Sequence, residues 1–287
     1  MSDMEYKKNF LDELYNICIQ VANEVGAILS DYFSPSNKAN LMKSITTKTS
    51  LTDYATEADE KAEAKARQII KDLRPTDTIL GEEQGEDIGT GDLIWVIDPL
   101  DGTTNFVYGI DAFAVSIAVA VKADPNETTR VPVSAGTHGK VLAGVVYNPI
   151  RKELFGCIAS EKPLCNGTEI SLSNPVDLNR SLIGTGFSYD KDRRRRQAQL
   201  LTKILPNIRD IRRFGAASLD LCAVASGKLD GYFEVGLKPW DGAAGVLIAE
   251  EAGACVREIS TPEDGPMLIV SAPGIIDPLT DNITGSL

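Results

Sequence analysis

The stretch Leu93-Ile-Trp-Val-Ile-Asp-Pro-Leu-Asp-Gly-Thr-Thr-Asn-Phe106 decides how this chain folds around its acidic residues. A hydrophobic run ends at Asp98, a Pro-Leu pair turns the chain, and Asp101 opens a predicted helix. Such a strand-to-helix turn presents two carboxylates beside the free amides of the first helical turn. The amides favour an anion and the carboxylates a cation, so a phosphate bridged by Mg²⁺ would satisfy both. The alternative is structural: Asp101 caps the helix and Asp98 ends the strand.

Three further acidic segments favour the first interpretation. Glu82 and Glu83 follow a short apolar run, and Asp241 stands at the start of an apolar helix. Asp53 and Asp59 lie around the start of another helix. Each segment alone is typical of a solvated loop or a helix cap. Together they supply oxygen ligands without histidine or cysteine, and such a set suits Mg²⁺ or Mn²⁺ better than zinc.

The composition excludes several classes of protein. The 287 residues include 41 Asp and Glu against 29 Lys and Arg, which gives a formal charge of −12, and 43% are hydrophobic. This is an ordinary globular composition, and its acidity argues against a sequence-independent grip on nucleic acid or on an anionic membrane. The single histidine, His138, excludes a His-pair metal site, and no G-x-S-x-G elbow accompanies it for a Ser-His-Asp hydrolase.

Other features bear on compartment and partners. Five widely spaced cysteines without a C-x-x-C motif, a polar N-terminal segment and the lack of a long apolar run predict a soluble cytoplasmic protein. Residues 75–121 hold nine acids and no Lys or Arg, whereas residues 190–213 hold nine bases against three acids. This basic block is typical of a solvated helix face, with a subunit interface or an anionic partner as alternatives. Residues 123–140 predict a polar hairpin that places His138 on the surface.

Hydrophobic periodicity predicts a mixed helix and sheet architecture of the α+β class. We expect helices over residues 6–33, 57–73, 193–204, 217–227 and 241–253. We expect strands over residues 78–81, 93–98, 113–121, 141–147, 153–159, 181–187, 208–214, 230–235 and 254–259. Two lobes forming one catalytic unit are predicted, with residues 1–150 carrying most metal ligands and residues 151–287 carrying Asp241 and the substrate pocket. The pattern over residues 262–287 predicts no particular element.

The acidic motifs resemble those of a known family. G-E-E at 81–83, W-x-x-D-P-x-D-G-T-x-N-F at 95–106 and W-D-x-A-A-G at 240–245 are similar to the signatures of the inositol monophosphatase family, lithium-sensitive Mg²⁺-dependent phosphatases. The likeness extends from about residue 10 to 260, and the segment from Gly184 to Asp241 resembles the bacterial, especially actinobacterial, branch. It implies the layered α-β-α-β-α sandwich of the sugar phosphatases, and a homodimer.

The resemblance also implies a set of metal ligands. The first ion would be bound by Glu82 and Asp98 with the carbonyl of Leu100, and the second by Asp98, Asp101 and Asp241. A weaker third ion would lie near Glu82 and Glu83. Two or three Mg²⁺ ions are therefore expected, with Mn²⁺ as a possible substitute.

Substrate contacts follow from the same likeness. The amides of Gly102 and Thr103 would receive the phosphate, next to Asp101. Asp59 would orient the Thr103 hydroxyl against the attacking water, so Asp59, Thr103 and Glu82 form the implied catalytic set. The implied pocket and nearby positions are Gly215, Ala217, Glu234, Lys238 (where animal relatives often have histidine) and Lys48, a lysine near the metals.

These roles imply hydrolysis of a phosphomonoester by metal-activated water without a covalent intermediate, with myo-inositol 1-phosphate as substrate. Histidinol phosphate, fructose 1,6-bisphosphate, 3′-phosphoadenosine 5′-phosphate and other sugar or polyol phosphates remain alternatives, because the phosphate end is shared. A haloacid-dehalogenase-type phosphatase needs D-x-D, whereas Asp98 and Asp101 are three residues apart. A non-enzymatic interaction protein of the same fold, binding through the Arg193–Arg213 block, is the remaining alternative.

Overall fold

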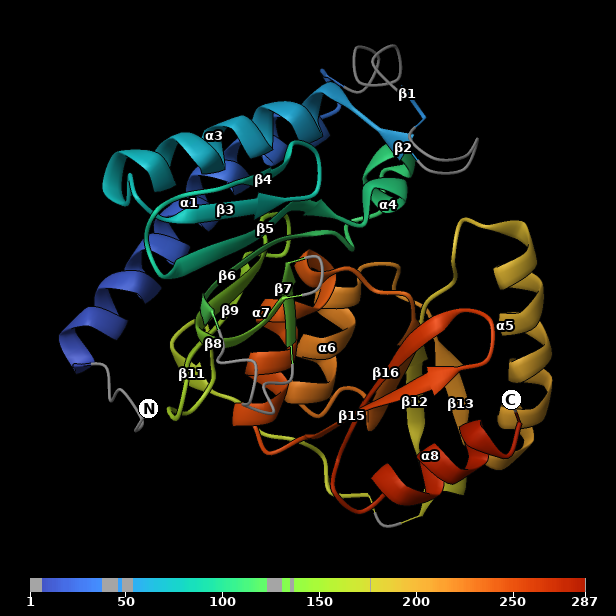
Figure 1. The fold of residues 1–287 in the computed structure, drawn as a ribbon. Helices are drawn as coiled ribbons and strands as arrows, with labels where there is room; N and C mark the ends of the chain where they lie inside the picture. The colour runs from blue at the N-terminus through green and yellow to red at the C-terminus, as the bar shows by residue number, and fades with distance from the viewer. Residues whose placement is uncertain are drawn as a thin grey trace.

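The computed structural model describes residues 7–37, 46–47, 54–122, 131–134, 137–175 and 177–286. They form two main β-sheets, separated and flanked by helices, and a small two-stranded sheet (Figure 1). The N-terminal half begins with α1 (Lys8–Phe33), β1 (Thr46–Thr47), β2 (Tyr54–Ala55) and α3 (Glu57–Leu73), and β1 pairs with β2. In the described part of the chain, no helix has both the length and the apolar character needed to cross a bilayer.

The large sheet has the strand order β11-β10-β9-β8-β6-β5-β3-β4, with β7 paired to β8. Its strands are β3 (Thr78–Gly81), β4 (Gly85–Asp87), β5 (Leu93–Asp101), β6 (Ala114–Lys122), β7 (Val131–Ser134), β8 (Thr137–Asn148), β9 (Glu153–Ile158), β10 (Leu164–Cys165) and β11 (Thr168–Glu169). Every residue of β5 is buried, as expected for a strand with helices on both faces. The short helix α4 (Thr103–Tyr108) follows β5.

The second sheet has the order β13-β12-β14-β16-β15. Its strands and helices are β12 (Leu182–Thr185), α5 (Lys191–Ile204), β13 (Asp210–Arg212), α6 (Ala217–Ala225), β14 (Gly231–Val235), α7 (Pro239–Glu251), β15 (Cys255–Thr261), β16 (Gly265–Ser271) and α8 (Ile276–Thr284). Two short 3₁₀ turns, Leu178–Arg180 and Leu205–Asn207, complete this half.

Three apolar clusters define the layers. The first joins α1 and α3 to one face of the large sheet, and the second joins the opposite face to α6 and α7. The third packs α5 and α8 on the outer face of the second sheet. Figure 1 shows the resulting order, with α6 and α7 between the two sheets. The predicted α-β-α-β-α sandwich is therefore confirmed.

The two central helices can lie between sheets because their surfaces are apolar and small. In α7 the residues Gly242–Ala249 are all buried, which is typical of a helix enclosed on every side. A Cβ atom added at Gly144 of β8 would lie 3.0 Å from the Cα atom of Ala244. The backbone of α7 thus approaches the sheet closely. This contact helps to set the position of the first turn of α7 relative to the large sheet.

The passage of the chain from one sheet to the other, and its C-terminal residues, bear on two predictions about organisation. Residue 150 lies in the turn between β8 and β9, which are both strands of the large sheet, so the sheets change between Glu169 and Leu182. The lobe division at residue 150 stays a prediction. Residues 262–287, which predicted no element, contain β16 in the interior of the second sheet and α8 on its outer face.

The basic block is partly structural. Arg193 and Arg196 of α5 both donate to the carboxylate of Asp264, which lies in the turn between β15 and β16. Arg194 and Arg195 are exposed on the same helix. Part of the block therefore ties α5 to the second sheet, and Arg194 and Arg195 face solvent.

We expect Gly144→Ala to destabilise the protein by about 1–3 kcal/mol, because the added methyl group would overpack the contact with α7. Gly242→Ala is the control, since its Cβ atom would have only an ordinary 3.8 Å contact, with Val246. Urea unfolding followed by circular dichroism would measure both. Equal stability of the two variants would contradict the packing argument.

Candidate active site

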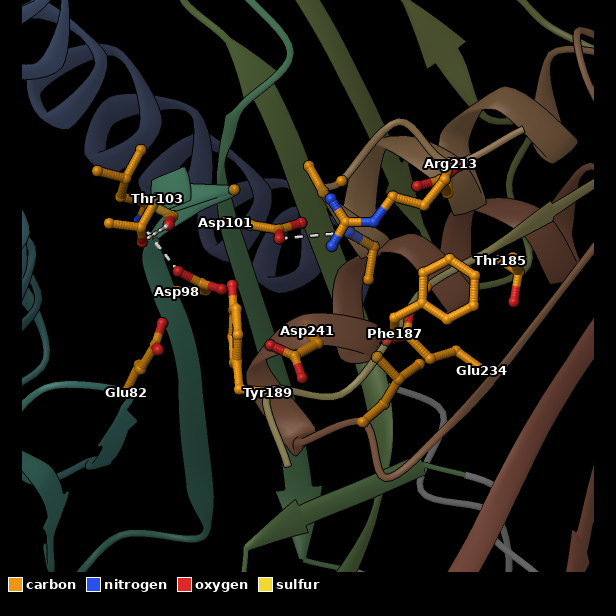
Figure 2. A pocket seen from close by; sticks show the side chains of 18 residues that line it. Glu82, Asp98, Asp101, Thr103, Thr185, Phe187, Tyr189, Arg213, Glu234 and Asp241 are labelled. Atoms are coloured by element: carbon orange, nitrogen blue, oxygen red, sulfur yellow. Dashed lines mark hydrogen bonds between the residues drawn. The ribbon is translucent and has the colours of Figure 1, made fainter. Parts of the chain in front are cut away.

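Five of the predicted acidic residues line one cavity between the two sheets, namely Glu82, Asp98, Asp101, Glu234 and Asp241 (Figure 2). Glu82, Asp98 and Asp101 come from the large sheet and its turns, and Asp241 comes from the first turn of α7. The remaining lining comes from the end of β5 and the start of α4, from α6, and from strands of the second sheet and the loops next to them. The full lining is Glu82, Asp98, Leu100, Asp101, Gly102, Thr103, Thr185, Gly186, Phe187, Tyr189, Arg213, Gly215, Ala216, Ala217, Asp220, Glu234, Leu237 and Asp241.

A local irregularity at the end of β5 places the two aspartates. The register with β6 shifts between Asp98 and Asp101, which is a bulge in the ladder. Asp98 is buried and accepts a hydrogen bond at Oδ1 from the Leu100 amide, at 3.0 Å. Gly102 then adopts a left-handed conformation with φ of 95°, which few side chains tolerate, and leads into α4. The Pro-Leu pair and the glycine together turn the chain at the cavity wall.

Asp101 is held by the N-terminus of α6. Its Oδ2 atom accepts from the Ser218 amide at 2.7 Å and from the Ser218 hydroxyl at 2.5 Å, and its Oδ1 atom accepts from the Ala217 amide at 3.3 Å. An acceptor at this position satisfies amides that the helix cannot. Ser218 was not among the predicted site residues. Only its place in the first turn of a helix after Gly215 could have indicated this role.

Thr103 and Asp59 meet, as the family resemblance implies. The Thr103 hydroxyl lies 3.2 Å from Asp59 Oδ1 and 3.2 Å from the Leu100 carbonyl oxygen, either of which can accept its proton. Asp59 also accepts at Oδ2 from the Thr56 amide at 2.8 Å and the Thr56 hydroxyl at 2.6 Å. These contacts form a capping box at the start of α3. Asp59 is therefore both a helix cap and a partner of the site.

The other predicted residues fall in different places. Glu234 and Gly215 line the cavity, and the hydroxyl of Tyr232 donates to Glu234. Glu83 lies beside Glu82 in the turn between β3 and β4, outside the cavity lining. Lys238 is exposed, and its amide donates to Asp241 Oδ2 at 2.7 Å. Lys48 and Asp53 lie outside the described residues.

Two charged residues of the cavity lining, Arg213 and Asp220, are not indicated as site residues by the sequence. Arg213 is the single basic residue in the lining described above, and it faces an otherwise acidic wall. Asp220 lies in α6, three residues after Ala217, and no motif marks it. The basic block that contains Arg213 is typical of a solvated helix face, and its pattern does not indicate a place in the cavity.

Crowding and burial perturb these acids. Burial and the charges of Glu82, Asp101 and Asp241 raise the pKa of Asp98 well above its usual range. Burial also raises the pKa of Asp101 to about 6, although the Ser218 hydrogen bonds oppose this shift. The pKa of Asp241 is raised for the same reason, with Asp101 and Glu82 as its main charged neighbours. Buried like charges of this kind cluster at functional sites.

The oxygen donors of the cavity are of the kind that a hard divalent cation binds, and they surround one space. The carboxylates of Glu82, Asp98, Asp101 and Asp241 and the Leu100 backbone lie around one cavity, and the repulsion among them is what a cation relieves. As the side chains stand, no three His, Cys, Asp or Glu in the described ranges already form a coordinating group. Asp98, Asp101 and Asp241 instead accept from backbone amides.

Comparison with known proteins decides the family. A sequence model of the inositol monophosphatase family matches residues 11–278. The chain belongs to this family. It is 44% identical over 244 residues to an inositol-1-monophosphatase of Mycobacterium leprae, covering 81% of this chain and 78% of that protein. It is 36% identical over 278 residues to the Nus factor SuhB of Pasteurella multocida, covering 95% and 96%.

The structures agree with the sequences. The extragenic suppressor protein suhB of Bartonella henselae superposes with a TM-score of 0.81 at 32% identity, covering 96% of this chain and all of that one. The resemblance inferred from the three motifs is confirmed. Membership of the inositol monophosphatase family supports phosphatase activity on small molecules and, in general terms, metal dependence.

Asp220 gives the cavity a testable pH dependence. Its side chain is 2% exposed, its Oδ1 atom has no hydrogen-bond partner among the described residues, and burial beside Asp101 and Glu234 raises its pKa to about 8. In the unfolded chain the carboxyl group titrates near 4, so its contribution to stability is complete below about pH 4 and is lost as pH rises through 8. Asp220→Asn should therefore gain stability over wild type by up to about 5 kcal/mol between pH 4 and pH 8, at about 1.4 kcal/mol per pH unit.

Thermal or urea unfolding of metal-free protein at several pH values would measure this difference. Asp281→Asn, an exposed change on α8, is the control and should track wild type at every pH. A difference for Asp220→Asn that stays constant from pH 4 to pH 8 would contradict the assignment of a raised pKa to this carboxyl group.

Proposed function

We propose that the chain hydrolyses phosphomonoesters of polyols, with myo-inositol 1-phosphate as substrate, in a reaction that depends on Mg²⁺. The observation that carries this proposal is the placement of four carboxylates and the Leu100 backbone around one cavity, beside the Thr103–Asp59 pair. The name of the Mycobacterium leprae relative supports the choice of substrate. Relatives named as Nus factors share the same fold, so the substrate itself needs a direct test.

The residues that would hold the metal ions are Glu82, Asp98, Asp101 and Asp241 with the carbonyl of Leu100. When bound, such ions lower the pKa of a bound water and neutralise charge on the phosphoryl oxygens and the leaving oxygen. The acidic wall needs this compensation before it can accept an anionic substrate. Glu83 beside Glu82 would contribute to a weaker third site.

Side chains and backbone groups of the protein would orient the attacking water and bind the phosphate. Asp59 is fixed by Thr56 and orients the Thr103 hydroxyl, whose oxygen can accept a hydrogen bond from the attacking water while its proton points to Asp59. The Gly102–Thr103 turn would hold the phosphate against α4. Because the resulting displacement is direct, no phosphorylated residue forms on the enzyme.

Glu234 would recognise the alcohol part of the substrate. It lies on β14 at the side of the cavity opposite Glu82 (Figure 2), and burial raises its pKa to about 7. A carboxyl group of this kind can bind hydroxyl groups or an amine. A polyol or amino-alcohol phosphate therefore fits better than a purine nucleotide, and histidinol phosphate is the principal alternative substrate.

We expect Asp98→Asn to lower Mg²⁺-dependent phosphate release from myo-inositol 1-phosphate by about 100-fold or more, because it removes a charge that both metal ions would share. Asp281→Asn makes the same chemical change on the exposed surface of α8 and should keep full activity. Colorimetric phosphate release, with and without Li⁺, measures both, and Li⁺ should inhibit the wild type.

A panel containing inositol 1-phosphate, histidinol phosphate and fructose 1,6-bisphosphate identifies the substrate. Highest kcat/KM for inositol 1-phosphate would support the proposal. Highest kcat/KM for histidinol phosphate would keep the mechanism and change the substrate. Absence of Mg²⁺-dependent hydrolysis of all three would favour the interaction-protein alternative.

A further inference from the structure

A buried ion pair lies behind the turn that carries Glu82. Glu63 and Arg67 are one helical turn apart in α3, and their side chains are 0% and 8% exposed. Arg67 Nε donates to Glu63 Oε1 at 2.7 Å. Neither residue lines the cavity or belongs to any motif of the sequence analysis. Charged residues this deeply buried need an explanation, because removing them from water is costly.

The pair forms hydrogen bonds with the backbone of the turn between β3 and β4. Glu63 Oε2 accepts from the Glu83 amide at 2.7 Å, and Glu63 Oε1 accepts from the Gln84 amide at 3.0 Å. Arg67 Nη2 donates to the Gly85 carbonyl oxygen at 2.5 Å. The two side chains therefore pair with two amide donors of the turn and with the carbonyl oxygen of Gly85, the first residue of β4. Glu82 is the first residue of that turn.

The approach is close enough to constrain the sequence of β3. A Cβ atom added at Gly81 would lie 2.5 Å from Glu63 Oε1 and 2.9 Å from Arg67 Nη2. Glycine is needed here so that the carboxylate can reach the strand end. Gly81, the glycine of the G-E-E motif, thus leaves room for the ion pair. Through the ion pair it also affects the turn that carries Glu82.

The same face of α3 contacts the other side of the site. Asp59, Glu63 and Arg67 are spaced by four residues, so they follow one another along a single face of the helix. Asp59 contacts Thr103, and Glu63 with Arg67 contacts the turn of Glu82. The helix α3 therefore contacts two walls of the cavity and holds them in a fixed position relative to each other.

Stability alone does not account for this arrangement. A buried ion pair can often be replaced by apolar residues at no loss of stability, so its presence is weak evidence for a stabilising role. Hydrogen bonds that orient a metal ligand from outside its coordination sphere commonly change metal affinity by about 10- to 100-fold. The contacts of this pair all converge on the segment that carries Glu82.

We propose that Glu63 and Arg67 are positioning residues, which hold the Glu82 turn so that the Glu82 carboxylate is directed into the metal-binding cavity. This inference rests on the proposed function, in which Glu82 is a metal ligand. The two residues touch neither substrate nor metal. Their effect should appear in metal affinity and in the metal concentration required for activity, and much less in kcat at saturating metal.

The test measures binding of Mn²⁺ to metal-free protein by calorimetry, and kcat as a function of Mg²⁺ concentration. Glu63→Gln keeps the shape but turns one acceptor into a donor facing an amide of the turn. It should weaken Mn²⁺ binding by about 10- to 100-fold while kcat at saturating Mg²⁺ stays within about threefold of wild type. Arg67→Lys is a milder variant that keeps the charge, and a smaller loss in the same direction is expected.

The control is Glu60→Gln, the same change on the exposed side of α3, which should bind Mn²⁺ as wild type does. If Glu63→Gln and Arg67→Lys fold and bind Mn²⁺ with wild-type affinity, the positioning role is wrong. A lower melting temperature with unchanged Mn²⁺ affinity would also overturn it, since that is the signature of a purely structural pair. Glu82→Gln distinguishes failure of this inference from failure of the proposed function. If Glu82→Gln also binds Mn²⁺ with wild-type affinity, Glu82 is not a metal ligand and the proposed function itself is contradicted.

Discussion

Repulsion among buried carboxylates is the constraint around which this protein is built. Asp98, Asp101 and Asp241 share a cavity with Glu82, and burial together with their mutual charge raises the pKa of the three aspartates. Each aspartate is restrained by at least one backbone amide, from Leu100, Ser218 or Lys238. A fold that keeps such a cluster is less stable than one with neutral residues there. This cost is expected where a cation completes the site.

The layered architecture explains how these groups meet. The large sheet delivers Asp98 and Asp101 at the irregular end of β5, and α7 delivers Asp241 because its small apolar residues let it pack between the sheets. The N-terminus of α6 joins the halves through Ser218 and Asp101. On the other side, α3 supports both the Thr103 hydroxyl and the Glu82 turn. The cavity therefore depends on contacts between layers that are far apart in the sequence.

Local signals were enough to predict much of this arrangement. The apolar run before Asp98 and the glycine after Asp101 predicted the strand-to-turn geometry, and helical spacing predicted α1 and α3 within about two residues. The sequence signals for β16 and α8 were weaker, because β16 contains Pro266 near its start and α8 contains Pro278 in its first turn. Both elements form because apolar residues such as Ile269 and Leu279 find partners in the third cluster.

The residues that the sequence did not reveal are those whose role arises only from tertiary contact. Ser218, Asp220 and Glu63 look like ordinary helical residues, and Arg213 looks like one more charge in a basic block. Their importance depends on which atoms lie opposite them in the fold. The predicted Glu83 illustrates the converse, since adjacency to Glu82 in sequence does not place its side chain in the cavity lining.

The central claim is that the cavity acids are kept for a divalent cation. It is tested most directly by counting the protons released when Mn²⁺ binds to metal-free protein near pH 6, using calorimetry in two buffers of different ionisation enthalpy. Because the acids hold protons that a metal must displace, we predict saturable binding with net proton release that falls as pH rises. Saturable binding without proton release at pH 6, or no binding at all, would contradict the account.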